Sequence, residues 1–143
     1  MSFPTPVRDV IALIARLAIG WVLSAHGCQK LFEYGIPNVQ KSFEGMGAPA
    51  PSLSAWVTAI VELGGGILLI LGAFTAIAGT IVALEMLGAF FTIHIGNPIF
   101  VEKNGGELVL MIAGTAILLA AFGAGKFSVD ALLNRNKAKK ATV

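Results

Sequence analysis

Four long apolar stretches follow one another along the chain, separated by short segments rich in glycine, proline and polar residues. The stretches cover approximately residues 8–31, 53–73, 75–95 and 106–123. Each is close to the ~20 residues that an α-helix needs to cross the hydrocarbon core of a bilayer. The pattern predicts an all-α integral membrane protein, a bundle of four transmembrane helices within residues 1–125. A basic tail, residues 126–143, follows it.

Composition supports this class. Of the 143 residues, 56% are hydrophobic and 13% are charged, whereas about 25% of the residues of a typical soluble domain are charged. The net charge of +2 is too small to suggest a nucleic-acid partner. A cleaved signal peptide is the alternative interpretation of the first stretch, but Arg16 lies inside it and three further stretches follow.

The charges in the connecting segments predict the orientation of the helices. The tail holds one acidic residue, Asp130, and five basic ones: Lys126, Arg135, Lys137, Lys139 and Lys140. The two longer connections are not strongly basic, so the positive-inside rule places both termini in the cytoplasm. The tail would also attract anionic lipid, at ~1 kcal/mol for each basic residue near the surface. A topology anchor is the simpler interpretation.

Five ionisable residues within the predicted spans are the main candidates for a buried polar site. Arg16 falls in the inner half of the first span, and His26 and Lys30 fall toward its outer end. Glu62 and Glu85 fall near the midplane of the second and third spans. Charged side chains inside a bilayer are costly, so they normally face the interior of a helix bundle and pair there.

Helical periodicity predicts that these five side chains meet. At ~100° per residue, His26 and Lys30 share the face of Arg16, and the opposite face is apolar. Small residues surround Glu62 and Glu85 on their helices, which is typical of packing faces in membranes. We therefore expect Arg16, Glu62 and Glu85 to form one buried cluster, with His26 and Lys30 toward the outside. Whether Arg16 pairs with one glutamate or with both stays open.

Three further residues are secondary candidates. His94 lies about 180° around its helix from Glu85, which predicts a capping or interfacial side chain. Glu107 lies at the outer boundary of the fourth span. Cys28, the only cysteine, excludes an intrachain disulfide and a cysteine-based zinc site. It lies about 160° around the helix from His26, which favours a packing residue over a reactive thiol. We predict no metal site, and haem held by His26 and His94 is disfavoured because His94 is off that face.

Several motifs resemble those of the DoxX family, and together they cover nearly the whole chain. RLAIGWVLSAHGCQKL, residues 16–31, is similar to the opening signature of that family, in which an arginine is followed by His-Gly and Lys-Leu. ELGGGILLILG, EMLGAFFTIHIGN and NGGELVLMIAGTAILLAAFGAGKFSVDAL resemble its later helices and its closing motif. One departure is Ala124, where a proline is common, and we expect only a slightly different turn there.

The resemblance implies a four-helix bundle in the bacterial cytoplasmic membrane and an association with redox chemistry. Relatives are linked to thiosulfate–quinone oxidoreduction, to quinone detoxification and to membrane complexes that manage oxidative or thiol stress. The resemblance does not decide whether the chain itself catalyses a reaction.

Three functional hypotheses follow. The first is a small membrane subunit of an oxidoreductase system whose buried polar site binds a quinone or a thiol-linked partner. The second is a non-catalytic anchor or assembly subunit that works through its long connection and its basic tail. The third is a proton-coupled transporter, which would need to form a homo-oligomer because four helices are few for a transport path. A buried ion pair of Arg16 that only fixes helix register is the structural alternative to a binding site.

Overall fold

The computed structural model describes residues 3–140, which form an all-helical bundle. The elements in chain order are α1 (Thr5–Cys28), η1 (Gln29–Tyr34), α2 (Ile36–Gly45), α3 (Pro51–Leu71), α4 (Thr75–Ala89), η2 (Phe90–His94), η3 (Val101–Lys103), α5 (Glu107–Phe122) and α6 (Val129–Lys140). The segments η1 and η2 are π-helical continuations of α1 and α4, and η3 is a single 3₁₀ turn.

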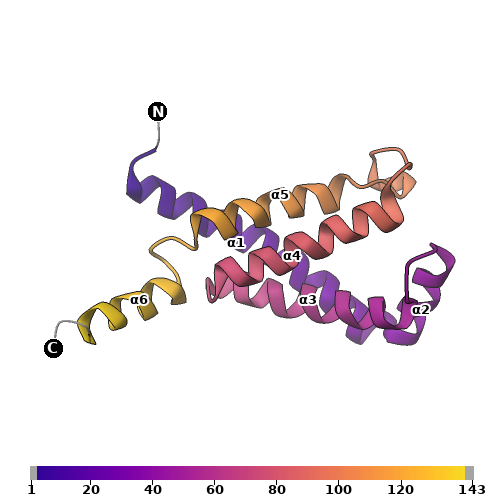
Figure 1. Ribbon diagram of the computed structural model, residues 1–143, viewed down its shortest axis with the longest axis horizontal. Coiled ribbons are helices and arrows are strands. Elements are labelled where there is room, and N and C mark those ends of the chain that lie inside the picture. Colours follow the sequence, from indigo (N-terminus) through magenta and orange to yellow (C-terminus); the bar gives the residue numbers. More distant parts are fainter. Residues whose placement is uncertain (1–2, 141–143) are drawn as a thin grey trace.

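Helices α1, α3, α4 and α5 run lengthwise beside one another (Figure 1). Helix α2 and the α4–α5 connection lie at one end, which we call the α2 end, and α6 projects from the other, the α6 end. Three helical segments are long and apolar enough to cross a membrane: Thr5–Tyr34, Pro51–Leu71 and Thr75–His94. The fourth, Glu107–Phe122, is apolar but shorter, as expected. The predicted four-helix membrane bundle is confirmed.

The bundle consists of two tightly packed helix pairs, α1 with α3 and α4 with α5. Glycines allow the first pair to approach closely, because a Cβ added at Gly27 would lie 2.5 Å from the backbone nitrogen of Leu63. Gly66 plays the same part against Ser24, and Gly79 of α4 packs against Ala116 of α5. Such small residues are the usual means of close helix packing in membranes. Large side chains such as Trp21, 73% exposed, cover the outside of the bundle, where they would contact lipid.

Two helices were not predicted. Helix α2 lies in the segment expected to be a loop, and its buried Ile36 and Val39 pack on Ala55 and Ala59 of α3. Its pattern is short and mixed with polar residues, so it resembles a loop in sequence. Helix α6 lies within the predicted tail, and the side chains of Lys139 and Lys140 lie outside the described part of the chain.

Candidate functional site

A cavity of about 250 Å³ lies toward the α2 end of the bundle, and we call it the inner cavity. Its lining is Leu23, His26, Lys30, Phe43, Met46, Thr58, Glu62, Glu85, Met86, Ala89, Ile93, His94, Asn104, Leu108, Val109 and Ile112. All the membrane-spanning helices contribute to it, and so does α2. The cavity thus brings together four of the five predicted site residues in a setting that is otherwise mostly apolar.

Lys30 and Glu62 form an ion pair across the α1–α3 interface, between Nζ and Oε2. Both side chains are more than four-fifths buried. The pair forms because the helical register of α1 and η1 places Lys30 opposite the midplane glutamate of α3. A buried charge pair stays stable only when both partners are present, since removal of one leaves the other uncompensated.

Glu85 faces this pair from α4 and has no partner of its own. Its Oε2 atom is buried and accepts no hydrogen bond from the described residues. An unsatisfied buried polar atom costs about 1–3 kcal/mol. The inner cavity therefore presents a carboxyl group whose unused hydrogen-bonding capacity a bound molecule would satisfy.

The predicted orientation of the His94 side chain, away from Glu85, is wrong, because His94 lines the same cavity as Glu85. The reason is the π-helical segment η2, in which each residue turns through less than 100°. The Nδ1 atom of His94 lies 2.8 Å from the carbonyl oxygen of Asn104. A carbonyl oxygen can only accept, so Nδ1–H donates this hydrogen bond, and Nε2 of a neutral ring is then an acceptor.

The prediction that Arg16 clusters with Glu62 and Glu85 is wrong. Arg16 is fully buried toward the α6 end, and its guanidinium donates to backbone carbonyls. The distances are 3.3 Å from Nη1 to the oxygen of Leu69, 3.1 Å from Nη1 to that of Ile70 and 2.5 Å from Nη2 to that of Phe127. The last carbonyls of a helix lack partners within it and carry partial negative charge. Arg16 therefore caps α3 and holds the segment after α5.

Residues 126–130, which we call the clasp, bind to the turn between α3 and α4. The carboxylate of Asp130 accepts hydrogen bonds from the backbone N–H groups of Phe74 and Thr75, at 2.7 and 2.9 Å. Its own N–H donates to the carbonyl of Gly72, at 2.9 Å. Burial acts to raise the pKa of Asp130, but the hydrogen bonds from Thr75 and Phe74 and the charge of Arg16 outweigh it and lower that pKa. Sequence analysis missed this role, because Asp130 lies 55 residues after Thr75, at the helix start that it caps.

The remaining secondary candidates lie outside the inner cavity. Glu107 accepts a hydrogen bond at 2.8 Å from the backbone N–H of Val101, so it orders the α4–α5 connection. Cys28 is exposed on the surface of α1 and does not line the cavity.

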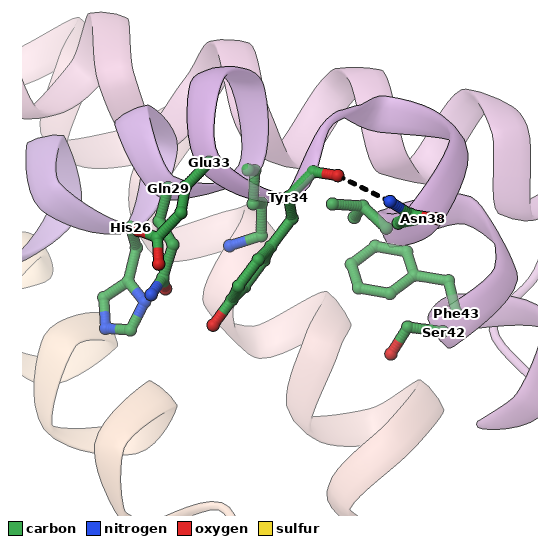
Figure 2. A pocket seen from close by; sticks show the side chains of 9 residues that line it. His26, Gln29, Glu33, Tyr34, Asn38, Ser42 and Phe43 are labelled. Atoms are coloured by element: carbon green, nitrogen blue, oxygen red, sulfur yellow. Dashed lines mark hydrogen bonds between the residues drawn. The ribbon is translucent and has the colours of Figure 1, made fainter.

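A second cavity, the vestibule, adjoins the inner cavity at the α2 end and measures about 480 Å³. Its lining is His26, Gln29, Lys30, Glu33, Tyr34, Asn38, Val39, Ser42 and Phe43. In Figure 2, His26, Gln29 and Glu33 lie on one side of Tyr34, and Ser42 and Phe43 of α2 lie on the other. A hydrogen bond of 2.8 Å from the Asn38 side chain to the carbonyl of Tyr34 fixes the start of α2.

These dimensions limit what the inner cavity can hold. Its volume lies below the ~300–1,000 Å³ of pockets that enclose drug-sized ligands. A haem between His26 and His94 therefore does not fit. A single ring or a small polar group fits, and it would meet an ammonium, two carboxylates and two imidazoles.

Comparisons with known proteins identify relatives over nearly the whole length. The family model described as DoxX matches residues 11–95. A protein of Haemophilus influenzae without a characterised function is 33% identical over 126 residues, which is 86% of this chain and 90% of that protein. CatD of Bacillus subtilis, provisionally named an oxidoreductase, is 30% identical over 129 residues, 90% and 91% of the two chains. The Escherichia coli inner membrane protein YqjF is 30% identical over 134 residues, 90% and 96% of the two chains. No solved structure matches the chain.

Proposed function

Since the chain belongs to the DoxX family and is a multi-pass bacterial membrane protein, we propose that it is a small membrane subunit of an oxidoreductase system. In this proposal the inner cavity binds the headgroup of a quinone. The observation that carries it is the buried, unpartnered Oε2 of Glu85 beside the Lys30–Glu62 pair, inside an apolar cavity. The naming of the relative CatD as an oxidoreductase supports the same class of function.

The shape and polarity of the inner cavity suit such a ligand. A quinone headgroup is a flat ring with a carbonyl oxygen at each of two opposite positions. Leu23, Met86 and Ile112 offer apolar contacts to a ring, and pockets of this kind use few polar groups to fix orientation. About 250 Å³ accommodates the ring but not its isoprenoid tail, which would extend into the surrounding lipid.

Each polar side chain has a role in this arrangement. The ammonium group of Lys30 would donate a hydrogen bond to one quinone carbonyl, and Glu62 holds Lys30 in place. Glu85 would hold a proton next to the ring, as a positioned general acid or base does. A bound quinone supplies reversible two-electron, two-proton chemistry. The electrons would come from a protein partner in the same membrane system.

Direct binding tests the proposal. The purified protein in lipid nanodiscs should bind short-chain ubiquinone or menaquinone analogues in a calorimetric titration. Lys30→Met should weaken binding about tenfold or more, because a hydrogen bond to a charged group contributes about 1.5–3 kcal/mol. Glu85→Leu should also weaken binding, because it removes the protonated carboxyl that would donate a hydrogen bond to the other quinone carbonyl. Glu102→Leu, the same change at an exposed residue of η3, is the matched control and should bind as the unaltered protein does.

Two results would contradict the proposal. One is the absence of binding by folded protein in nanodiscs, with no quinone retained from the membrane during purification. The other is equal loss of binding in Glu85→Leu and Glu102→Leu, which would place the ligand elsewhere.

A non-catalytic anchor is the second candidate function. It is favoured by α6, which carries exposed Leu132 and Leu133 beside Arg135 and Lys137 and is held to the bundle by the clasp. If the chain is an anchor, substitutions in α6 should abolish binding of the partner protein, and Glu85→Gln should leave that binding intact. The proposed quinone subunit would instead show altered redox activity of the complex in Glu85→Gln, with the partner retained.

A further inference from the structure

The vestibule and the inner cavity share part of their walls. We infer that the vestibule is the aqueous entrance of the inner cavity, through which water, protons and small hydrophilic solutes reach Glu85 from the α2 side. The inference rests on the proposed function only in taking the inner cavity as the working site. The route itself can be tested without any quinone.

Contiguity is the first argument. His26, Lys30 and Phe43 line both cavities, so a molecule in the vestibule and one in the inner cavity would contact the same three side chains. Lys30 also connects the two chambers chemically, because its ammonium group is paired with Glu62 of the inner cavity. Residues of α1, η1 and α2 therefore form the boundary between the two chambers.

The change in polarity along the route is the second argument. In addition to the shared residues, the vestibule is lined by Gln29, Glu33, Tyr34, Asn38 and Ser42, all of which can hydrogen-bond with water. Water occupies a cavity when the cavity is large enough and offers two or more polar partners, and 480 Å³ with this lining meets both conditions. Beyond the shared wall, the lining becomes mostly apolar.

The titratable groups that line the inner cavity with Glu85 also favour an entrance on the α2 side. They are His26 of α1, Lys30 of η1, Glu62 of α3 and His94 of η2, and α2 and α5 contribute uncharged lining residues. His26 and Lys30 are also part of the vestibule wall. A proton on its way to Glu85 would therefore find titratable groups toward α2, whereas the fully buried Arg16 toward α6 is occupied by three carbonyls.

Phe43 is the movable part of the boundary. It belongs to α2, whose buried Ile36 and Val39 pack on α3, and Phe43 itself is only partly buried against that cluster. A short helix with so few buried contacts opens at low cost in free energy. Rotation of Phe43, or a small displacement of α2, would widen the passage without disturbing the transmembrane helices.

Thiol accessibility tests the route. In a Cys28→Ser background, Thr58→Cys places a thiol in the lining of the inner cavity, and Ile60→Cys places one on the lipid side of the same helix, where Ile60 is 59% exposed. A charged, membrane-impermeant methanethiosulfonate is added to the α2 side of proteoliposomes. Thr58→Cys should react about tenfold faster than Ile60→Cys, or more. The lipid around the Ile60→Cys thiol raises its pKa, and each pKa unit removes about nine-tenths of the reactive thiolate.

Changes at Phe43 test the position of the passage. In the Thr58→Cys protein, Phe43→Ala should speed labelling and Phe43→Trp should slow it. Phe32→Ala, the same truncation at a residue that is 79% exposed and outside both cavities, should have no effect. Size-exclusion chromatography of each variant establishes that the bundle is intact.

The outcomes separate this inference from the proposed function. The route is overturned if a membrane-permeant reagent labels Thr58→Cys while the impermeant one on the α2 side does not. It is also overturned if Phe43→Trp and Phe32→Ala label at equal rates. Labelling as expected in a protein that binds no quinone would support the route and refute the proposed ligand.

Discussion

Arg16 shows how a single buried cation can serve structure. Its three hydrogen bonds go to carbonyls of α3 and of the segment after α5, at the opposite end of the bundle from the Lys30–Glu62 pair. A guanidinium suits this position because its fixed fork of donors reaches several oxygens at once, which a lysine ammonium does less well.

Arg16→Met should therefore lower the free energy of unfolding by about 3 kcal/mol or more, since buried carbonyls would lose charge-assisted hydrogen bonds worth about 1.5–3 kcal/mol each. Arg16→Lys should lower the free energy of unfolding by less. Unfolding in detergent by a denaturant titration measures the change, and Arg8→Met, at an exposed position, is the control. Equal midpoints for Arg16→Met and Arg8→Met would contradict the capping role.

At the level of single residues, part of the candidate site could be predicted from the sequence. Helical periodicity predicted that His26, Lys30, Glu62 and Glu85 face inward, and all four line one cavity. The partner of Arg16 could not be found by matching side-chain charges, because its partners are backbone carbonyls. A functional role for these residues stays a prediction.

Irregular elements explain what periodicity missed. A constant 100° per residue holds for α-helices, whereas α1 and α4 both end in π-helical segments before they reach the α2 end. The π-helical turn of η2 brings His94 to the inner cavity. Such turns are frequent at functional sites, and here two of them flank the same cavity. No sequence signal marks them in this chain.

The clasp is an element-scale device whose strength should depend on pH. The folded-state pKa of Asp130 is lowered, so its contribution to stability is fully present above the ordinary aspartate pKa of ~3.9 and is lost as the pH falls through the lowered value. Asp130→Ala should destabilise the protein by about 1 kcal/mol at neutral pH, as loss of a helix N-cap does.

The measurement is the difference in thermal midpoint between the unaltered protein and Asp130→Ala, recorded from pH 7 down to pH 3 and below. That difference should shrink toward zero on the acid side. Glu44→Ala, at an exposed residue of α2, should show no such convergence. A constant difference across the range would mean that the charge of Asp130 does not contribute.

For the whole molecule, hydropathy was a sufficient guide to the architecture. The four apolar helices begin and end within about three residues of the predicted spans, because helix length in a membrane follows bilayer thickness. Helix α2 could not be predicted in the same way. It gains its stability from packing on Ala55 and Ala59 of α3. Such contacts between helices cannot be read from the hydropathy of a single segment.

The orientation in the membrane is a prediction for the whole chain. Both termini should lie in the cytoplasm, because the basic tail resists translocation. A reporter that is active only in the cytoplasm should therefore work when fused after residue 143, and one that needs export should not. The reverse should hold for insertion into the α4–α5 connection at Glu102. A tail accessible from outside intact cells would refute this topology and would reverse the compartment that the vestibule faces.

The clasp also orders the assembly of the protein in time. During synthesis, α1, α3 and α4 are all translated before residues 126–130. Until then, Arg16 lacks the Phe127 carbonyl, and the first N–H groups of α4 lack the Asp130 carboxylate. The early helices are therefore left with unmet hydrogen bonds that only a late segment can complete. We therefore expect the α3–α4 turn to reach its final packing only after residues 126–130 have been translated, and a chain interrupted before residue 130 should lack these contacts.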